Sequence, residues 1–196
     1  MSDKAKRYFI KEDYNCRNKE IYFNDTPLTD EYQDDVYKTA LEFFNLHGLS
    51  GVLDLGCGSG FKLMKYFGDV ENTIGIDLPA TVNWLREKYP DKTWSSDFKQ
   101  PITGYDLLIC SDVIEHVLDP DKILDIIEKS KPKILVISTP NRDRGLNQNG
   151  PPNNRHHIRE WSKEEFSAYI SSRFNIEAHL EFDKNTQCVV CFPKTK

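Results

Sequence analysis

Residues 52–60 read Val-Leu-Asp-Leu-Gly-Cys-Gly-Ser-Gly, and this stretch decides the fold class. Its first four positions are typical of a buried strand, and they lead directly into Gly56, Gly58 and Gly60. Glycine adopts positive φ without strain and lets the backbone approach a ligand closely. Residues 61–67 then predict a helix, whose N-terminus can face an anionic group such as a carboxylate. The stretch therefore predicts a strand, a ligand-binding turn and a helix.

Strands and helices alternate through the rest of the chain. Strands are expected at residues 51–55, 72–77, 93–95, 105–110, 133–138, 176–182 and 187–192. Helices are expected between them, two beginning at Pro79 and Pro120, and a capping box of Ser162 and Glu165 opens another. This alternation predicts an α/β fold whose mostly parallel sheet is covered on both faces and ends in an antiparallel hairpin.

Acidic residues follow two of the predicted strands. Asp77 ends the strand at 72–77, and Asp97 follows the strand at 93–95. An acid at the first place can accept both hydroxyls of a ribose. An acid at the second can bind an adenine amino group. Together with the glycines, these acids indicate a nucleoside-containing ligand.

The order Asp-x-Gly-x-Gly-x-Gly differs from the dinucleotide fingerprint G-x-G-x-x-G. It resembles motif I of the class I S-adenosylmethionine (SAM) dependent methyltransferases, and the resemblance extends over residues 50–192. It implies a seven-stranded Rossmann-like methyltransferase fold with SAM as cofactor. A glycine turn of an NAD-type or ligand-free Rossmann fold is the alternative. The resemblance assigns to the cofactor site Asp54, Gly56, Gly58, Gly60, Asp77, Leu78, Asp97, Phe98, Cys110 and Ser111.

A second constellation follows the strand at 105–110. Asp112, Glu115 and His116 have the i, i+3, i+4 spacing that places side chains on one helical face, where they could bind a divalent cation. With the later His157, they resemble the ubiquinone-biosynthesis and small-RNA 3′-end O-methyltransferases, in which the first of these acids is Glu. The resemblance implies a Mg²⁺ or Mn²⁺ site, and metal-free lining of the SAM pocket is the alternative. His157 is the preferred catalytic base, with His116 and Asp112 as further catalytic candidates.

Residues 141–157 form a long loop at the end of the sheet where ligands bind. The loop and the residues after it resemble bacterial methyltransferases of glycan and secondary-metabolite pathways. Four arginines there could attract an anionic acceptor, although a solvated basic loop fits them equally: Arg142, Arg144, Arg155 and Arg159.

Residues 1–48 are predicted to form a helical lid or substrate segment ahead of a SAM-binding domain at 49–196. A helix is expected at 29–46 with Thr29 or Asp30 as its cap. The aromatic residues before this helix suit stacking on a sugar or another ring, or packing of the lid: Tyr8, Phe9, Tyr14, Tyr22 and Phe23.

Composition limits the possible partners. The chain has 196 residues, about one domain, and its net charge of −5 argues against bulk nucleic-acid binding. No apolar run approaches the roughly 18 residues of a membrane span, and no signal-peptide pattern is present, so a cytoplasmic protein is expected. Cys188 and Cys191, three apart on a predicted strand, should point to opposite faces and serve packing.

These features favour a SAM-dependent O-methyltransferase that acts on a small hydroxylated acceptor, such as a saccharide or a glycoconjugate precursor, with or without a divalent cation. Methylation of the 2′-hydroxyl at an RNA 3′ end is a second hypothesis, which the acidic net charge disfavours. A SAM-fold protein that binds a partner without catalysis is a third, and the intact glycine loop and both acids disfavour it.

Overall fold

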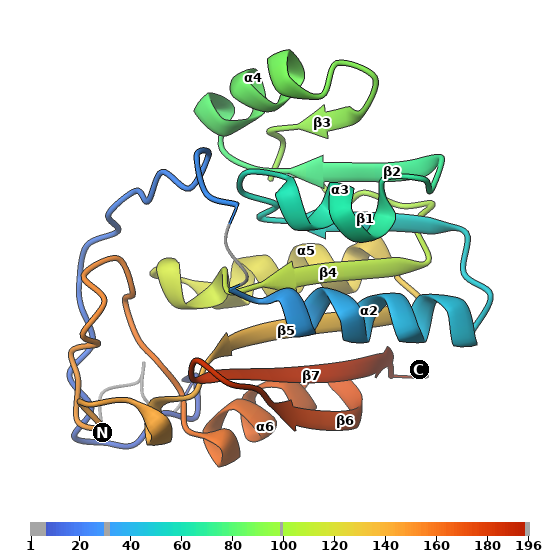
Figure 1. The fold of residues 1–196 in the computed structure, drawn as a ribbon. Coiled ribbons are helices and arrows are strands. Elements are labelled where there is room, and N and C mark those ends of the chain that lie inside the picture. The colour runs from blue at the N-terminus through green and yellow to red at the C-terminus, as the bar shows by residue number, and fades with distance from the viewer. Residues whose placement is uncertain (1–6, 30–31, 99, 195–196) are drawn as a thin grey trace.

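The computed structural model describes residues 7–29, 32–98 and 100–194 and places the strands in a single mixed sheet (Figure 1). Within these residues the sheet has seven strands in the order β3-β2-β1-β4-β5-β7-β6. They are β1 (Gly51–Leu55), β2 (Asn72–Ile76), β3 (Thr93–Ser95), β4 (Leu107–Ser111), β5 (Ile134–Pro140), β6 (Phe174–Glu181) and β7 (Thr186–Pro193). Strands β1 to β5 pair in parallel, whereas β7 is antiparallel to both β5 and β6. The predicted fold class is confirmed.

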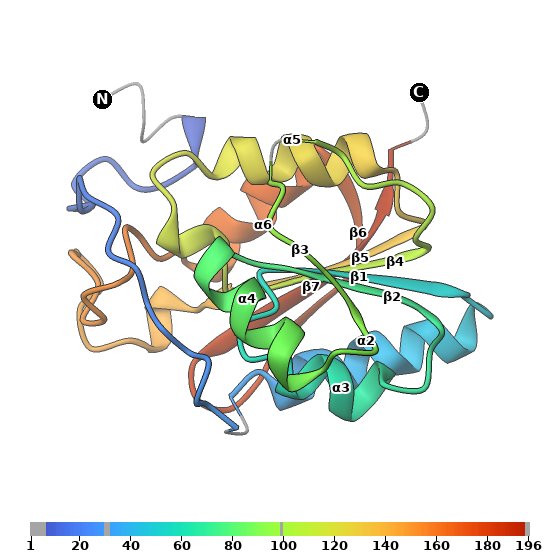
Figure 2. The same ribbon diagram turned by 90° about the horizontal axis from the view of Figure 1, so that it is seen from above.

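Helices cover both faces of the sheet, as Figure 2 shows. One layer contains α2 (Asp34–Leu46), α3 (Phe61–Phe67) and α4 (Pro79–Lys88), and the other contains α5 (Pro120–Ser130) and α6 (Lys163–Ser171). Strand β4 is buried along its whole length because it lies between these layers. The capping box of α6 is present: Ser162 Oγ accepts a hydrogen bond from the Glu165 N–H, and the Glu165 carboxylate accepts one from the Ser162 N–H.

Cys188 and Cys191 on β7 pack into different hydrophobic cores, one on each face of the sheet. Both side chains are fully buried and neither forms a disulfide. Residues three apart in a strand point to opposite faces and cannot act together on one redox centre or metal. Their predicted packing role is confirmed.

Helix α2 begins later than predicted. It starts at Asp34 rather than near Thr29, and the expected cap Asp30 lies outside the described residues. Gln33 precedes the helix with φ of 61°, a left-handed conformation, and no side chain caps the first turn. The amide of Gln33 instead donates to the carboxylate of Asp112 at 2.9 Å. Gln33 and Asp112 are 79 residues apart in the sequence. Local helix propensity therefore could not predict this contact at the start of the helix.

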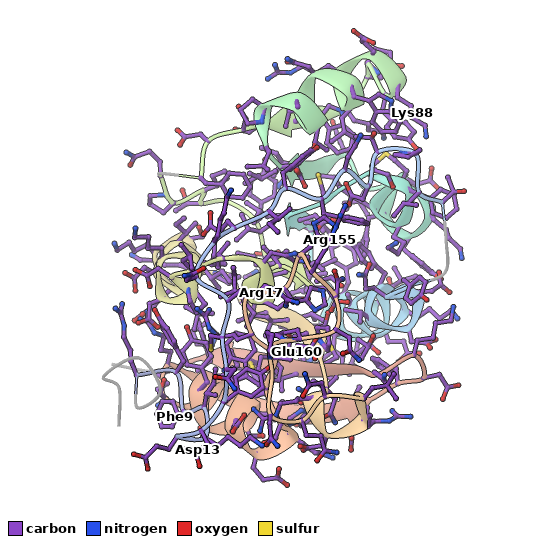
Figure 3. All side chains as sticks on the ribbon, turned by 90° about the vertical axis from the view of Figure 1, so that its left-hand side faces the viewer. Phe9, Asp13, Arg17, Lys88, Arg155 and Glu160 are labelled. Carbon is purple, nitrogen blue, oxygen red and sulfur yellow. The ribbon has the colours of Figure 1, made fainter. Side chains whose placement is uncertain are left out.

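Two irregular segments lie over the carboxyl edge of the parallel strands: residues 7–29, called here the N-terminal strap, and residues 141–161, called the 141–161 loop (Figures 1 and 3). The loop is not wholly irregular, since it contains the short 3₁₀ helix η2 (Arg142–Arg144). Backbone hydrogen bonds join the two segments. The N–H of Asn15 donates to the carbonyl of Asn149, and the N–H of Arg17 donates to the carbonyl of Ile158. Among the described residues, no helix is long and apolar enough to cross a membrane.

Candidate active site

A cavity of about 1020 Å³ opens at the carboxyl ends of the parallel strands. Residues just past β1, β2, β4 and β5 line it, together with parts of the strap, the 141–161 loop and the turn between β6 and β7. Open α/β sheets bind ligands at this edge, where neighbouring strands send their connections to opposite faces. The cavity therefore lies where the sequence predicts a nucleoside-containing ligand.

The glycine loop follows β1 and needs glycine for two separate reasons. Gly56 has φ of 82°, and a Cβ there would lie 2.3 Å from the Val113 side chain. Gly58 has φ of 54°, and a Cβ there would lie 1.9 Å from a carboxylate oxygen of Asp25. Both the left-handed conformation and the close neighbours exclude larger residues. Other parts of the protein therefore come close to the loop backbone at these glycines, as the sequence predicts.

Asp77 connects the glycine loop to the start of α4. Its Oδ2 accepts a hydrogen bond from the Gly58 N–H at 2.8 Å, and its Oδ1 accepts one from the Leu78 N–H at 2.7 Å. Burial raises the pKa of Asp77, whereas these two hydrogen bonds act to lower it. Asp77 and Leu78 both line the cavity, so the predicted ribose acid is accessible from it.

Asp54 lies beneath the same loop and is completely buried. Its Oδ2 accepts a hydrogen bond from the Tyr37 hydroxyl of α2 at 2.7 Å, while its Oδ1 has no hydrogen-bond partner among the described residues. Burial raises the pKa of Asp54 to about 7, against the lowering effect of the Tyr37 hydrogen bond. Asp54 therefore supports the loop from inside the core.

The structure brings half of the predicted cofactor residues to the cavity wall. Those that line it are Gly56, Asp77, Leu78, Phe98 and Ser111. Cys110 instead points into the hydrophobic core, and Asp97 is exposed outside the cavity lining. Gly58 and Gly60 shape the loop without lining the cavity themselves.

Asp112, Glu115 and His116 do not share one helical turn, so that expectation is wrong. Asp112 has φ of 51° and lies before the 3₁₀ helix η1 (Ile114–His116). Its carboxylate accepts hydrogen bonds from Ser138 Oγ at 2.6 Å and from Gln33 Nε2 at 2.9 Å. The left-handed turn at Asp112 separates this carboxylate from the helical face that Glu115 and His116 occupy.

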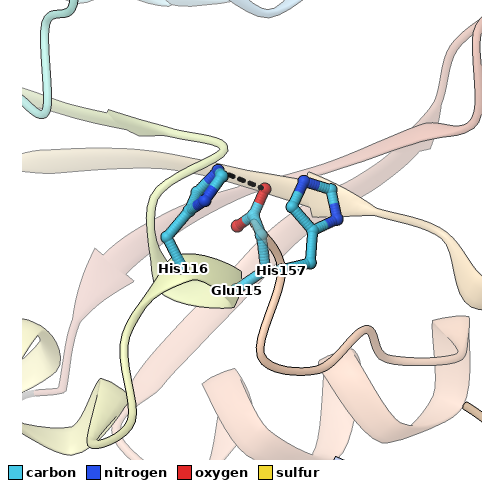
Figure 4. Close-up of side chains that lie close together, drawn as sticks. All are labelled: Glu115, His116 and His157. Atoms are coloured by element: carbon cyan, nitrogen blue, oxygen red, sulfur yellow. Dashed lines mark ion pairs between the residues drawn. The ribbon is translucent and has the colours of Figure 1, made fainter. Parts of the chain in front are cut away.

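Glu115, His116 and His157 instead form a compact cluster, shown in Figure 4, in which one possible metal-ligand atom from each lies within 4.8 Å of the others. Glu115 is completely buried; its Oε2 accepts from Thr139 Oγ1, and its Oε1 has no hydrogen-bond partner among the described residues. Burial lowers the pKa of His116 to about 4, which leaves its ring neutral and able to donate a lone pair. An orphaned buried carboxylate oxygen beside two imidazoles fits a divalent cation.

His157 is held by its own loop. Its Nδ1 lies 2.6 Å from Oε1 of Glu160, and its Nε2 lies 2.9 Å from the Asn154 amide nitrogen. The His116 and His157 rings meet edge to face at 4.8 Å between centroids. Because both rings line the cavity, they are placed to act on a ligand there.

The arginines of the 141–161 loop do not form a positively charged entrance to the cavity, although the sequence allowed one that could attract an anionic acceptor. Arg142 and Arg159 are buried; the first pairs with Glu165, and the second donates to the carbonyls of Val117 and Leu118. None of the four predicted arginines is among the described residues that line the cavity. The guanidinium groups of Arg142 and Arg159 hold the loop against the rest of the protein.

Sequence reasoning missed most of the cavity wall that comes from irregular segments. Of the predicted strap aromatics, Tyr22 and Phe23 line the cavity, whereas Tyr8 and Tyr14 are buried in the core and Phe9 is exposed elsewhere. Further wall residues from irregular segments that no motif signalled are Glu20, Ile21, Asp25, Leu28, Leu146, Lys184 and Asn185. These segments have no hydrophobic period, so only tertiary contacts reveal their positions.

Comparison with known proteins places the chain in a family. The family described as a methyltransferase domain matches residues 29–178, more than half of the chain. A ubiquinone biosynthesis O-methyltransferase of Rickettsia bellii is 33% identical over 107 residues, which cover 47% of this chain and 43% of that protein. The aligned region spans less than half the length of the curated relatives it matches.

Solved structures share the fold. The methyltransferase domain of a bacterial Hen1 protein, CtHen1-C, has a TM-score of 0.65 at 21% identity, over 85% of this chain and 100% of that chain. A SAM dependent methyltransferase from Aquifex aeolicus has a TM-score of 0.64 at 19% identity, over 88% of this chain and 100% of that one. With the family match, the strand order and the glycine loop beside Asp77, these findings show that the chain belongs to the class I S-adenosylmethionine-dependent methyltransferases.

Proposed function

We propose that this chain transfers the methyl group of SAM to a hydroxyl of a small acceptor, with a saccharide or glycoconjugate precursor as the acceptor class. The observation that carries the proposal is that a single cavity joins the glycine loop to the histidine cluster, since Gly56, Asp77 and His157 all line it. A cofactor and an acceptor hydroxyl can therefore meet in one cavity. The O-methyltransferase activity named for the Rickettsia bellii relative supports this proposal.

SAM would lie in the half of the cavity that the glycine loop shapes. Asp77 is the proposed ribose ligand, and Leu78 and Phe98 are the proposed neighbours of the adenine end. Ser111, at the end of β4, lines the same half and is the proposed neighbour of the methionine end. When bound, SAM supplies an electrophilic methyl group on a sulfonium, which an aligned nucleophile displaces in line.

The residues of this chain would then prepare the nucleophile. A hydroxyl is a weak nucleophile until it loses its proton, and His157 is the proposed base that accepts this proton at Nε2. Glu160 at Nδ1 fixes the ring and stabilises the imidazolium that forms. The acceptor oxygen forms its bond to the methyl carbon while the carbon–sulfur bond breaks. The products are the methyl ether, S-adenosylhomocysteine and a proton.

In an alternative arrangement, in which His157 is not the base, Glu115, His116 and His157 would hold a divalent cation that would lower the pKa of an acceptor hydroxyl. One carboxylate and two imidazoles suit Mn²⁺ better than Mg²⁺, because Mg²⁺ prefers oxygen ligands. Asp112, predicted as a fourth ligand, already accepts hydrogen bonds from Ser138 and Gln33. Its proposed role is to position the turn that carries Glu115 and His116.

The charge of the cavity wall favours a neutral hydroxylated acceptor. Its described acidic residues are Glu20, Asp25, Asp77, Asp112 and Glu160, and its lysines are Lys62 and Lys184. This excess of acids repels a phosphate-rich chain, so it weighs against RNA as the acceptor. Tyr22 and Phe23 offer ring faces on which a sugar or an aromatic acceptor can stack.

Two measurements test the proposal. Calorimetry with SAM should show binding to the chain, and no binding at millimolar cofactor contradicts it. Labelled SAM, incubated with a panel of neutral saccharides and with a small RNA, each with and without a chelator, then identifies the acceptor class. Labelling of RNA that the chelator abolishes favours RNA 3′-terminal 2′-O-methylation, and cofactor binding without turnover in any metabolite extract favours a non-catalytic protein.

The cytoplasmic location stays a prediction from composition.

A further inference from the structure

A carboxylate from the N-terminal strap lies directly against the glycine loop. A Cβ on Gly58 would lie 1.9 Å from Oδ2 of Asp25, a separation from a non-bonded atom that real Cβ atoms essentially never show. Glycine at position 58 is therefore what lets this carboxylate approach the loop backbone. Asp25 lines the same cavity as Gly56 and Asp77. The strap thus brings a negative charge to the cofactor end of the cavity.

Contacts on the N-terminal side of Asp25 hold this part of the strap in place. Glu20 accepts a hydrogen bond from the Leu118 N–H at 2.7 Å. The hydroxyls of Tyr22 and Thr81 lie 3.3 Å apart, which ties the strap to α4. The Phe23 ring lies 5.0 Å from that of His156 in the 141–161 loop. Three separate parts of the fold therefore fix the path of the strap toward Asp25.

The carboxylate of Asp25 joins that of Asp77 in lining this end of the cavity, and Asp54 lies buried beneath the loop. The negative charges of Asp77 and Asp25 both add to the effect of burial in raising the pKa of Asp54. Oδ1 of Asp54 is buried and has no hydrogen-bond partner among the described residues. Lys62 offsets part of this charge, since it lines the cavity and lowers the pKa of Asp54. Like charges gathered in one cavity favour the entry of a cation.

We propose that Asp25 is a cofactor-binding residue that recognises the positive charge of SAM, so that the site distinguishes SAM from the product S-adenosylhomocysteine. This inference rests on the proposed function. SAM carries an ammonium, a sulfonium and a carboxylate, and hence one net positive charge, whereas the product has lost the sulfonium and is neutral overall. A carboxylate at this place stabilises bound SAM more than bound product, and it favours product release after transfer.

The test compares the dissociation constants of both ligands for the full chain and for Asp25→Asn, by calorimetry. Because asparagine keeps the shape and removes the charge, the affinity for SAM should fall about tenfold, while that for S-adenosylhomocysteine should change less than about twofold. Asp13→Asn is the matched control, because Asp13 is an exposed acid of the same strap outside the cavity lining (Figure 3). Product binding also serves as an internal check that the variant is folded.

An equal loss for both ligands would show that Asp25 only shapes the cavity, which overturns the proposal. Unchanged affinities overturn it as well. Tighter binding of both ligands by Asp25→Asn would show that the carboxylate competes with the cofactor, which also contradicts it. Failure of the unaltered chain to bind SAM is a different result, because it contradicts the proposed function itself.

Discussion

His157 is oriented by two side chains of its own loop. An amide nitrogen can only donate, so the contact of Asn154 Nδ2 with Nε2 indicates that Nε2 accepts. The ring proton then lies on Nδ1, where Oε1 of Glu160 accepts it at 2.6 Å. In this tautomer the Nε2 lone pair accepts the hydrogen bond from Asn154, and it becomes available to a proton or a metal ion once that hydrogen bond is broken. Glu160 is therefore a positioning residue for His157.

The substitution Glu160→Gln should lower kcat about 10- to 100-fold with little change in the KM for SAM. An amide that donates to Nδ1 would move the ring proton to Nε2, whereas Glu160→Asp should restore part of the activity. Steady-state kinetics measure both effects, and Glu177→Gln, an exposed glutamate on β6, is the control. A rise in KM for SAM with unchanged kcat would contradict this role.

Asp54 predicts a pH-dependent stability. Its pKa is about 7 in the folded chain and about 3.9 in an unfolded one, so between these values the folded state holds a proton that the unfolded state has lost. The contribution of Asp54 to the free energy of unfolding therefore falls as the pH rises from about 4 to about 7.

Because Asn cannot titrate, the free energy of unfolding of Asp54→Asn should increase relative to the unaltered chain between pH 5 and pH 8. Denaturant unfolding at both values measures the difference, with Asp91→Asn as the exposed control. A difference that does not change with pH would show that Asp54 is ionised in the fold.

Among the elements, the strap and the 141–161 loop act as one wall. The Arg17 guanidinium donates to the carbonyls of Pro152, Asn154 and His157, at distances from 2.6 to 3.1 Å. One strap side chain thus satisfies three carbonyls of the loop that carries the proposed base. Neither segment has regular structure over most of its length, so such cross-contacts hold it in place.

The substitution Arg17→Ala should loosen the 141–161 loop without unfolding the sheet. Removing hydrogen bonds to three carbonyls should make limited proteolysis within the loop about tenfold faster, while the midpoint of thermal unfolding changes little. Mass spectrometry of the fragments locates the cut, and Lys19→Ala on the exposed strap is the control. Cleavage at an unchanged rate would show that other contacts hold the loop.

At the scale of the whole molecule, the fold assembles the proposed metal site from distant segments. Glu115 and His116 follow β4, whereas His157 comes from the loop after β5. The Ile158 N–H donates to the Glu115 carbonyl at 2.6 Å and joins the two segments beside the cluster. A bound cation would therefore crosslink two connections of the sheet and stabilise the folded state.

Addition of Mn²⁺ at ten times its dissociation constant should raise the unfolding midpoint by about 3 °C. The increase should disappear in Glu115→Gln, which keeps the shape of the side chain and removes its charge. Thermal unfolding with and without a chelator measures it, and Glu177→Gln is again the control. An equal shift in Glu115→Gln would place the cation elsewhere.

The local parts of this architecture could be predicted because they depend on neighbours in the sequence. The glycine loop, the strand pattern, the α6 capping box and the opposed Cys188 and Cys191 follow from backbone geometry and side-chain alternation. The start of α2 and the turn at Asp112 could not be predicted, because Gln33 and Asp112 meet only through the tertiary fold.

The sequence alone determined the α/β sheet and the likeness to methyltransferases, because apolar alternation and glycine spacing are local properties. Only the tertiary structure decided which side chains share the cavity. It placed Asp25 against Gly58, buried Arg142 and Arg159 away from the cavity, and separated Asp112 from Glu115 and His116. The physical reason is that long-range contacts, rather than any local periodicity, fix irregular segments at the edge of a sheet.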